Sequence, residues 1–268
     1  MDYTTKNYVN SSHLKTRKNF HNIYSKPSIN LNEEVFRSVK LNSNERILDI
    51  GCGYGDLLKF FRISGHQGEL IGIDISPGMI KDAQLDNKDT TFNIGNGEEL
   101  NFINNSFDIV ICKHALYHFQ DIDKVLKEIY RVLKNDGFFI IAINSLAKSS
   151  REIVQGMKQH ICKSLNNYNF LDSNERLNFE NYNNFTNNYF KTIKEIKINR
   201  YIELDNKDPF VDYMNSFREF WDPLPEHLEW DKAMTIVSKE LNNILEKEGK
   251  IKEMVSTCII VLKKKGVK

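Results

Sequence analysis

The chain has 268 residues, 40% of them hydrophobic and 27% charged, which is the composition of an ordinary soluble globular protein. Its length suits one large α/β domain with additions, or two small domains. Lysine and arginine number 37 against 36 aspartates and glutamates, so no net basic charge is present to hold nucleic acid by counterion release.

The N-terminal residues and the cysteines indicate the compartment. Residues 1–20 contain no apolar segment of the kind a secretory signal needs, and no apolar run reaches the ~18 residues of a membrane span. The cysteines form neither a C-x-x-C pair nor a cluster with histidines at zinc spacing; they are Cys52, Cys112, Cys162 and Cys258. We therefore expect a cytoplasmic protein with reduced thiols, no bound metal and no membrane contact.

Apolar runs and helical patterns alternate from residue 46 onward. The runs predict five strands, over residues 46–50, 70–73, 90–94, 107–112 and 138–143. The clearest helix is predicted over residues 122–133, with apolar side chains at the i, i+3, i+4, i+7 spacing of one buried face, and Asp136-Gly137 is expected to end it. Another helix is predicted to begin after Ser76, which stands before a proline as an N-cap does. Continuous apolar strands that alternate with helices indicate a parallel sheet covered on both faces.

The segments on either side of this core are less regular. Residues 1–40 are expected to be helical, with inward-facing anchors at Leu14, Phe20, Ile23 and Tyr24. Beyond residue 147 the patterns predict helices over 148–167, 209–220 and 231–247 and strands over 191–204 and 256–263. The aromatic residues between positions 210 and 221 have near-helical spacing, which fits either core packing or a substrate lid.

The first strand ends in a glycine turn with glycines at positions 51, 53 and 55. Such a turn is a general sign of nucleotide binding, and the dinucleotide fingerprint requires a third glycine at the position that Asp56 occupies here. A pyrophosphate at the N-terminus of the following helix would meet this carboxylate at close range, which is unfavourable. The turn therefore favours a zwitterionic or positively charged ligand over NAD.

Residues 47–55 (ILDIGCGYG) resemble the first motif of class I S-adenosylmethionine-dependent methyltransferases. The resemblance implies that the backbone of Gly51 and Gly53 approaches the methionine part of the cofactor. It also implies that Asp49, the acidic residue before the turn, orders the turn and nearby water.

Two further segments match the family in order. Asp74 ends the second strand, where the resemblance implies an acid that binds both ribose hydroxyls, with Ile75 and Met79 flanking the adenine. Residues 95–108 are similar to the family pattern G-D-A-E-x-L-P-F…S-F-D. Asn96 replaces the family's aspartate, which accepts from the adenine amino group, and its amide oxygen is expected to serve instead. The resemblance implies that Gly97 offers its backbone N–H to the ring.

The last two segments flank the predicted fourth strand and helix. Residues 113–119 (KHALYHF) resemble the loop that passes the methyl end of the cofactor, and Lys113 at its start is expected among the cofactor-binding residues. Residues 128–137 are close to the family's E-x-x-R-V-L-K-P-G-G. The resemblance covers about residues 46–145.

The resemblance implies a Rossmann-like, doubly wound α/β fold with a mostly parallel seven-stranded sheet and an antiparallel last strand. We expect a helical N-terminal lid over residues 1–45 and the cofactor-binding core over residues 46–147. Residues 148–250 then hold the remaining core strand and a cap over the acceptor site, and residues 251–268 form the final strand of the core sheet.

The implied function is transfer of a methyl group from S-adenosyl-L-methionine to a small molecule by in-line displacement, with S-adenosyl-L-homocysteine as product. The sulfonium already activates the methyl group, so placement of the acceptor is the main task of the protein. A base matters only for an acceptor protonated near pH 7, and His118 and His114 are the candidates, with a pocket-wall role as the alternative. Tyr117 either binds substrate or packs. Arg17 either closes over the carboxylate of the cofactor as part of the N-terminal lid or is a surface charge.

Two other classes remain open at this stage: a non-catalytic cofactor-binding or scaffold subunit, and an NAD-linked oxidoreductase. The neutral net charge argues against a nucleic-acid acceptor and favours a small molecule. The sequence names neither the acceptor, nor the atom that is methylated, nor the oligomeric state.

Overall fold

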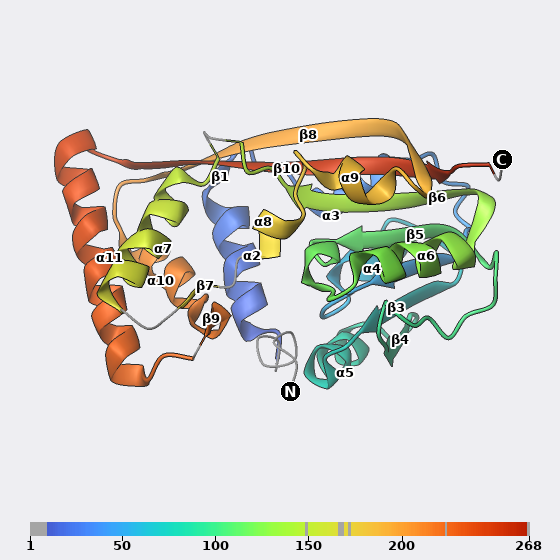
Figure 1. The fold of residues 1–268 in the computed structure, drawn as a ribbon, viewed down its shortest axis with the longest axis horizontal. Coiled ribbons are helices and arrows are strands. Elements are labelled where there is room, and N and C mark those ends of the chain that lie inside the picture. The colour runs from blue at the N-terminus through green and yellow to red at the C-terminus, as the bar shows by residue number, and fades with distance from the viewer. Residues whose placement is uncertain (1–9, 148–149, 166–168, 171–172, 223, 267–268) are drawn as a thin grey trace.

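A computed structural model of the chain describes residues 10–147, 150–165, 169–170, 173–222 and 224–266. Figure 1 shows a sheet flanked by helices at one end of the molecule and a group of helices at the other end. Two long strands, β8 (Phe190–Leu204) and β10 (Ile251–Lys264), run through both parts. The first nine residues of the predicted lid lie outside the described residues.

The main sheet has eight strands in the order β1-β8-β10-β6-β5-β2-β3-β4. Parallel pairing joins β6, β5, β2, β3 and β4, whereas β10 is antiparallel to both β6 and β8. The remaining strands are β1 (Ser25–Lys26), β2 (Ile47–Ile50), β3 (Leu70–Asp74), β4 (Thr91–Ile94), β5 (Phe107–Lys113) and β6 (Leu133–Asn144). The predicted doubly wound, mostly parallel sheet with an antiparallel last strand is confirmed.

The predicted count of seven strands is one short. The additional strand is β1, which pairs antiparallel to the end of β8 through Ser25 opposite Ile202 and Lys26 opposite Tyr201. A strand of two residues is too short to show an alternating pattern in the sequence, and so only the pairing reveals it.

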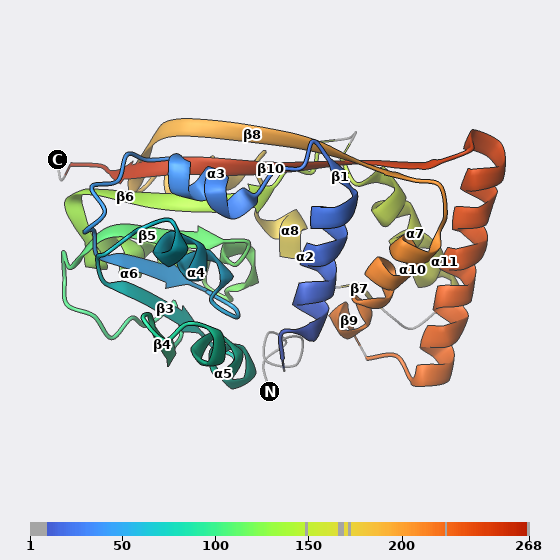
Figure 2. The same cartoon turned by 180° about the vertical axis from the view of Figure 1, so that it is seen from behind.

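Helices cover both faces of the sheet (Figures 1 and 2). One face carries α6 (Ile122–Val132) and α9 (Tyr182–Thr186), and the other carries α3 (Leu31–Arg37) and α4 (Asp56–Ile63). All six apolar residues of the predicted helix face are buried, five of them in α6 and the sixth, Leu133, at the start of β6. The helix α5 (Pro77–Asp86) begins as expected, with the backbone N–H of Met79 donating to Ser76 Oγ at 3.1 Å.

One predicted boundary is wrong. The helix α6 ends at Val132, and β6 begins directly at Leu133, so that Asp136-Gly137 lies inside the strand rather than between helix and strand. Gly137 packs there against the neighbouring strand, since a Cβ on it would lie 2.7 Å from the carbonyl oxygen of Asp108.

The second part of the molecule is a group of helices, called the helical cap here, formed by α7 (Glu152–Ser164), α10 (Asp208–Asn215) and α11 (His227–Glu248), with α2 (Ser12–Tyr24) beside them. Its apolar core also includes Ile202, Leu204, Ile251 and Val255 from β8 and β10. Shorter elements complete the described chain: η1 (Leu116–His118), β7 (Asn169–Phe170), α8 (Ser173–Arg176), η2 (Arg218–Phe220) and β9 (Trp221–Asp222), with β7 antiparallel to β9.

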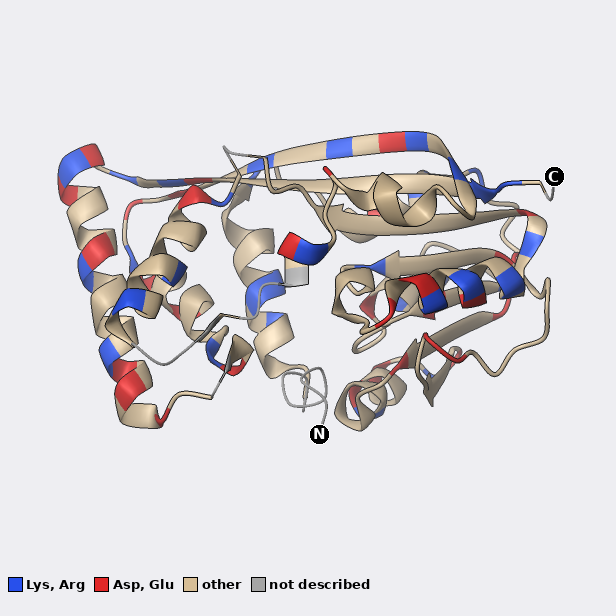
Figure 3. Ribbon diagram, viewed as in Figure 1, with Lys and Arg blue, Asp and Glu red and all other residues tan. Residues whose placement is uncertain are grey.

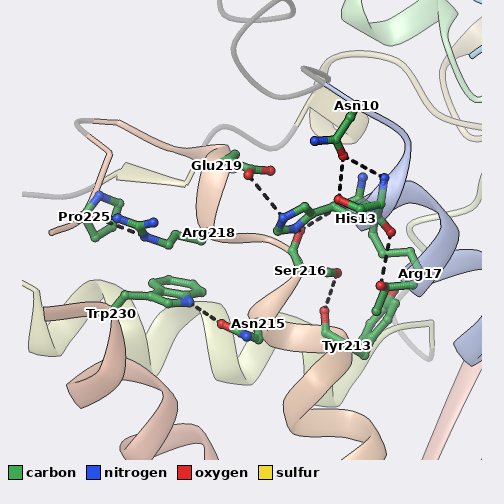
Figure 4. Close-up of polar contacts among 12 residues, drawn as sticks. Asn10, His13, Arg17, Tyr213, Asn215, Ser216, Arg218, Glu219, Pro225 and Trp230 are labelled. Carbon is green, nitrogen blue, oxygen red and sulfur yellow. Dashed lines mark hydrogen bonds and ion pairs between the residues drawn. The ribbon is translucent and has the colours of Figure 1, made fainter. Parts of the chain in front are cut away.

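The N-terminal helix α2 packs against the cap. Phe20 stacks on Tyr213 with the ring centroids 4.3 Å apart, whereas Ile23 is 68% exposed, so the prediction that Ile23 faces inward is wrong. Figure 4 shows how the side chains of α2 reach the segment after α10. Arg17 Nη1 donates to the carbonyl oxygen of Ser216 at 2.6 Å, and His13 Nε2 lies 3.3 Å from Glu219 Oε1.

Basic and acidic residues are interspersed along α6 and α11 (Figure 3), as the near-zero net charge suggests. Within the described part of the chain, no helix combines the length and the apolar character that crossing a membrane requires. Nor do the described residues include a group of three His, Cys, Asp or Glu side chains that could hold a metal ion.

Candidate active site

A cavity of about 430 Å³ lies between the carboxyl ends of the central parallel strands and the helices α2 and α10. Ligands of open α/β sheets bind at this edge, where the strand order reverses, and the volume lies within the ~300–1,000 Å³ usual for ligand sites. Twelve of the thirteen site residues predicted from the sequence line this cavity: Arg17, Gly51, Gly53, Asp74, Ile75, Met79, Asn96, Gly97, Lys113, His114, Tyr117 and His118.

The glycine turn follows β2 and leads into α4. Gly51, Gly53 and Gly55 all have positive φ angles, of 71°, 55° and 76°, which side chains disfavour. A Cβ on Gly51 would also lie 2.4 Å from the Cβ of Ala115. At Gly53 the nearest atom would be Leu14 Cδ2 at 3.4 Å, so here the turn faces the cavity beneath α2.

Asp49, the thirteenth predicted residue, lies beneath the turn and is 1% exposed. Its Oδ1 atom is buried and has no hydrogen-bond partner among the described residues. Burial raises the pKa of this carboxyl to about 7, although the charge of Lys113 opposes the rise. A buried acid with an unused acceptor is suited to a donor or positive charge supplied from the cavity side.

Asp74 ends β3 and is bonded to the turn. Its Oδ2 accepts from the backbone N–H of Gly53 at 2.9 Å, and its Oδ1 accepts from the N–H of Ser76 at 2.9 Å. Burial raises the pKa of Asp74, and these hydrogen bonds act in the opposite direction. A backbone hydrogen bond from Ile75 also lowers the pKa of Asp74. A carboxylate has about four acceptor positions, so at least one remains for a ligand.

The loop after β4 forms another wall of the cavity. Asn96 Oδ1 accepts from the backbone N–H of Glu98 at 3.0 Å, so the amide oxygen expected to face adenine is already used once in a local turn. Gly97 has no room for a side chain, since a Cβ on it would lie 2.8 Å from a ring carbon of Phe119 and 2.9 Å from Ile50 Cγ2.

Lys113 belongs to a polar cluster that the sequence analysis did not identify. Its Nζ donates to Asn32 Oδ1 at 2.6 Å and lies 3.6 Å from Asp56 Oδ2, and Asp56 also pairs with Lys18. The pKa of Asp56 is lowered because Lys113, Asn32 and Lys18 together outweigh its burial. Asn32 and Lys18 come from the irregular N-terminal region, where no motif marked them. The cluster explains why an acid stands at the first position of α4.

The loop after β5 carries the candidate bases. His114 has a φ of 54° and donates its backbone N–H to the carbonyl oxygen of Ala142 at 2.8 Å. Burial lowers its pKa to about 3, with Lys113, Arg200 and Arg151 contributing. An imidazole of such low pKa accepts a proton poorly at neutral pH, which leaves His118 as the better candidate. The rings of His118 and Tyr117 are in edge contact, with centroids 4.6 Å apart.

Arg17 is buried, with 9% of its surface exposed, so it is not a surface charge. Its guanidinium lies 5.3 Å from the ring centroid of Phe217 and 5.1 Å from that of Phe220. Arg17 thereby joins α2 to the aromatic segment after α10 and closes the cavity on the cap side.

Three further residues that the sequence did not single out line the cap end of the cavity: His21, Arg151 and Arg200. Tyr213, from the predicted aromatic cluster, lines it beside them. Arg151 Nη2 donates to Tyr213 Oη at 2.8 Å, and His21 Nε2 lies 3.3 Å from the same oxygen. They come from four separate elements beyond the matched motifs, so no spacing in the sequence connects them.

Comparison with known proteins places this geometry in a family. The sequence model of the methyltransferase domain family matches residues 48–141. This range includes the glycine turn, Asp74 and the loop after β5. The methyltransferase YrhH of Bacillus subtilis is 31% identical over 142 residues, which is 49% of this chain and 77% of that protein. The chain belongs to the class I S-adenosylmethionine-dependent methyltransferases.

Other methyltransferases are similar over part of the chain. The ubiquinone/menaquinone biosynthesis C-methyltransferase UbiE of Rickettsia typhi is 35% identical over 156 residues, which cover 52% of this chain and 62% of that protein. The chain spans about half the length of the first curated methyltransferases it matches. A crystal structure of a methyltransferase from Bacillus halodurans shares the fold, with a TM-score of 0.62 at 17% identity over 87% of this chain and 97% of that one.

This methyltransferase chain offers a site that fits the donor of its family. The turn is open to the cavity at Gly53, and Asp74 has an acceptor position left beside the turn. Asp49 has a buried acceptor atom that no described residue uses. The zwitterionic methionine part and the ribose hydroxyls of S-adenosylmethionine complement such a set of acceptors and backbone groups. Both the fold and the residues of the cavity are therefore consistent with S-adenosylmethionine as the ligand.

Proposed function

We propose that this methyltransferase moves a methyl group from S-adenosylmethionine to a small molecule bound in the same cavity, between the glycine turn and the cap. The supporting observation is that one cavity joins the predicted cofactor residues to Arg17, Tyr117 and His118. The family supplies the donor, whose sulfonium makes the methyl group reactive without further activation. The chain must then hold an acceptor in line with it and exclude water.

The cofactor side of the proposal assigns one task to each group. Gly51 and Gly53 let the backbone approach the methionine part, and Asp49 lies beneath to accept from it or from ordered water. Asp74 binds the ribose hydroxyls, and Ile75 and Met79 flank the adenine. Asn96 and Gly97 face the edge of the adenine ring, and Lys113 holds Asp56 and Asn32 at the base of the turn.

The proposal assigns His118 the part of a base where the acceptor loses a proton during the reaction. His118 lines the cavity on the loop after β5, next to Tyr117. His114 is assigned to the wall of the pocket, because its pKa of about 3 makes it a weak proton acceptor. Positioning alone can lower the barrier by roughly 7–11 kcal/mol, so loss of the base need not abolish the reaction.

The shape of the site supports a small-molecule acceptor. The cavity is covered by α2, with Arg17 anchored to the Ser216 carbonyl and packed on two aromatic rings. A covered cavity of about 430 Å³ suits a small molecule beside the cofactor better than a polymer. The interspersed surface charges in Figure 3 likewise offer no continuous basic stripe for nucleic acid on α6 or α11.

The proposal also assigns roles to the segments outside the cofactor-binding core and a cellular compartment to the protein. Residues 10–45 act as the described part of the lid, and residues 150–250 supply β8 and the cap. Four free cysteines, three of them buried, suit a reducing compartment, and we propose the cytoplasm.

Two measurements test the proposal together. Isothermal titration calorimetry should show binding of S-adenosylhomocysteine, with no heat from NAD. Incubation with methyl-labelled S-adenosylmethionine and a cell extract, separated afterwards into small molecules, protein and RNA, should place the label among the small molecules. Label in protein or RNA would contradict the acceptor class. Binding without transfer to any fraction would favour the scaffold alternative, and a lack of binding would overturn the proposal.

A further inference from the structure

The cavity has opposite charge character at its two ends. The carboxylates among its described lining residues are Asp56, Asp74 and Glu98, which belong to the elements around the glycine turn. Asp56 is moreover paired with Lys18 and Lys113. The cap end is lined by three arginines from three elements: Arg17 of α2, Arg151 before α7 and Arg200 of β8.

Arg200 is the most unusual of the three. It is 3% exposed, and its Nε atom is buried without a hydrogen-bond partner among the described residues. It lies opposite Val255 in the β8–β10 ladder, and Val255 and Thr257 line the same cavity. The hydroxyl of Thr257 is also buried with no described partner. A buried guanidinium without a carboxylate is costly, so its retention points to a ligand.

The described residues around Arg200 include a second arginine and, on the same face of the β8–β10 ladder, the acidic side chain of Glu253. Arg151 has a positive φ of 61°, and its Nη2 donates to Tyr213 Oη at 2.8 Å. Glu253 attracts Arg151, but its carboxylate accepts from the backbone N–H of Val154 at 2.9 Å, at the start of α7. Glu253 is not among the groups that act on Arg200, which are Arg151 and Tyr213.

Two imidazoles, those of His21 and His114, line the cavity together with these arginines. Burial lowers the pKa of His21 well below its ordinary value, and the charges of Arg151 and Arg200 lower it further. The same two arginines contribute to the low pKa of His114. Both rings are therefore neutral near pH 7, and neither adds to nor offsets the charge of the guanidinium groups.

We propose that the methyl acceptor carries an anionic group, a carboxylate or a phosphate, which Arg200 and Arg151 bind at the cap end of the cavity. The planar guanidinium matches both kinds of oxyanion with two parallel N–H donors. The proposal rests on the proposed function, because it concerns the acceptor of the same site. It narrows the substrate class from small molecules to small organic acids or phosphate esters.

A different anion must be distinguished from the acceptor, namely the carboxylate of the methyl donor itself. The test compares S-adenosylhomocysteine with methylthioadenosine, which lacks the amino-acid part, in the wild type and in Arg200→Met. If Arg200 serves the acceptor, this substitution leaves the affinity for both nucleosides unchanged. If it weakens S-adenosylhomocysteine alone, Arg200 holds the donor carboxylate and the proposal is overturned.

Anion binding is then measured directly. Benzoate, phenyl phosphate and inorganic phosphate are titrated calorimetrically at constant ionic strength into the protein with and without S-adenosylhomocysteine, and benzamide and phenol serve as neutral counterparts. We expect at least one anion to bind the wild type tenfold or more tighter than its neutral counterpart. Arg200→Met should weaken it by about tenfold to a hundredfold, as loss of a charge-assisted hydrogen bond implies. The proposal is overturned if Arg200→Met binds the anion as tightly as the wild type does, or if the wild type binds none of the anions.

Two controls separate this role from a structural one. Arg37→Met removes a guanidinium that is exposed and paired with Glu33, and it should leave anion binding unchanged. Arg200→Met should keep or raise the ligand-free melting temperature, because it removes a buried unpartnered charge, whereas a structural arginine would lower it. If Arg200→Met does not fold, Arg200→Lys keeps the charge without the paired donors and should still lose most of the anion affinity. Absent nucleoside binding with intact anion binding would count against the proposed function alone.

Discussion

Asp74 Oδ2 accepts the backbone N–H of Gly53 at 2.9 Å, and this bond ties the end of β3 to the glycine turn after β2. The second oxygen of the same carboxylate accepts from Ser76, the N-cap residue of α5. One side chain therefore sets the positions of a turn and of a helix start, both of which border the cavity. Its proposed bond to the ribose would be added to this arrangement without replacing it.

The first prediction concerns this carboxylate. Asp74→Ala should weaken the binding of S-adenosylhomocysteine by about tenfold or more, because it removes an ionised acceptor worth roughly 1.5–3 kcal/mol. Calorimetric titration measures the effect. Asp86→Ala, at the exposed end of α5, is the matched control and should bind like the wild type. Unchanged affinity in Asp74→Ala would show that the ribose lies elsewhere.

The second prediction concerns the buried carboxyl of Asp49. Its pKa is raised from 3.8 to about 7, so the folded state holds a proton that the unfolded state releases above about pH 4. The stabilisation from the protonated form is therefore complete below pH 4 and is lost as the pH rises to 7. Asp49→Asn cannot titrate and should gain on the wild type by about 2 kcal/mol between pH 5 and pH 8.

Urea unfolding of the ligand-free proteins at the two pH values measures this difference. Glu253, whose pKa is also raised to about 7 by burial, titrates in both proteins and cancels from the comparison. A stability difference between Asp49→Asn and the wild type that is the same at pH 5 and pH 8 would contradict the raised pKa.

The third prediction concerns two of the seven histidines. His114 should stay neutral between pH 5 and pH 8, because burial and the nearby charges of Lys113, Arg200 and Arg151 lower its pKa to about 3. The pKa of His21 should lie well below the ordinary imidazole value, because burial and the charges of Arg151 and Arg200 lower it. Side-chain nuclear magnetic resonance of the imidazole carbons follows both titrations, with His21→Asn and His114→Asn assigning the signals. A midpoint above pH 5 for His114, or an ordinary midpoint for His21, would show that these rings are less buried or less close to positive charge than the structure indicates.

The fourth prediction concerns the packing of α2. Phe20→Ala should destabilise the protein by about 3–5 kcal/mol, since it removes a buried ring that stacks on Tyr213. Ile23→Ala, three residues further on the same helix, should change stability by less than about 0.5 kcal/mol because Ile23 is exposed. The free energy of unfolding of both variants, measured with denaturant, tests this difference. Equal effects would mean that α2 docks through another face.

Sequence patterns were most reliable where a single local rule applied. The strand-turn-helix unit around Gly51 follows from an apolar run, left-handed glycines and a helix start within ten residues, and the buried face of α6 follows from its periodicity alone. The site residues of these segments were predicted from the resemblance to the methyltransferase family. They lie together because the carboxyl ends of parallel strands meet at one edge of the sheet.

The remaining part of the site depends on long-range packing. Arg200 lies in a strand whose pattern shows alternation but not which strand it will pair with, and Arg151 lies before a helix with no motif of its own. Their approach to His21 and Tyr213 results from the β8–β10 register and from the docking of α2, neither of which has a local signature. For the same reason the face of α2 was assigned correctly at Phe20 and wrongly at Ile23.

The shared strands β8 and β10 have a further consequence. Ile260 and Leu262 belong to the apolar core under α6, whereas Ile251 and Val255 of the same strand belong to the core of the cap. Because continuous hydrogen-bonded strands join the two cores, the cap cannot swing on a flexible hinge, and the two parts should melt in a single cooperative transition. A change in the width of the cavity is then expected to come from α2, which is held to the cap by the ring of Phe20 and the guanidinium of Arg17.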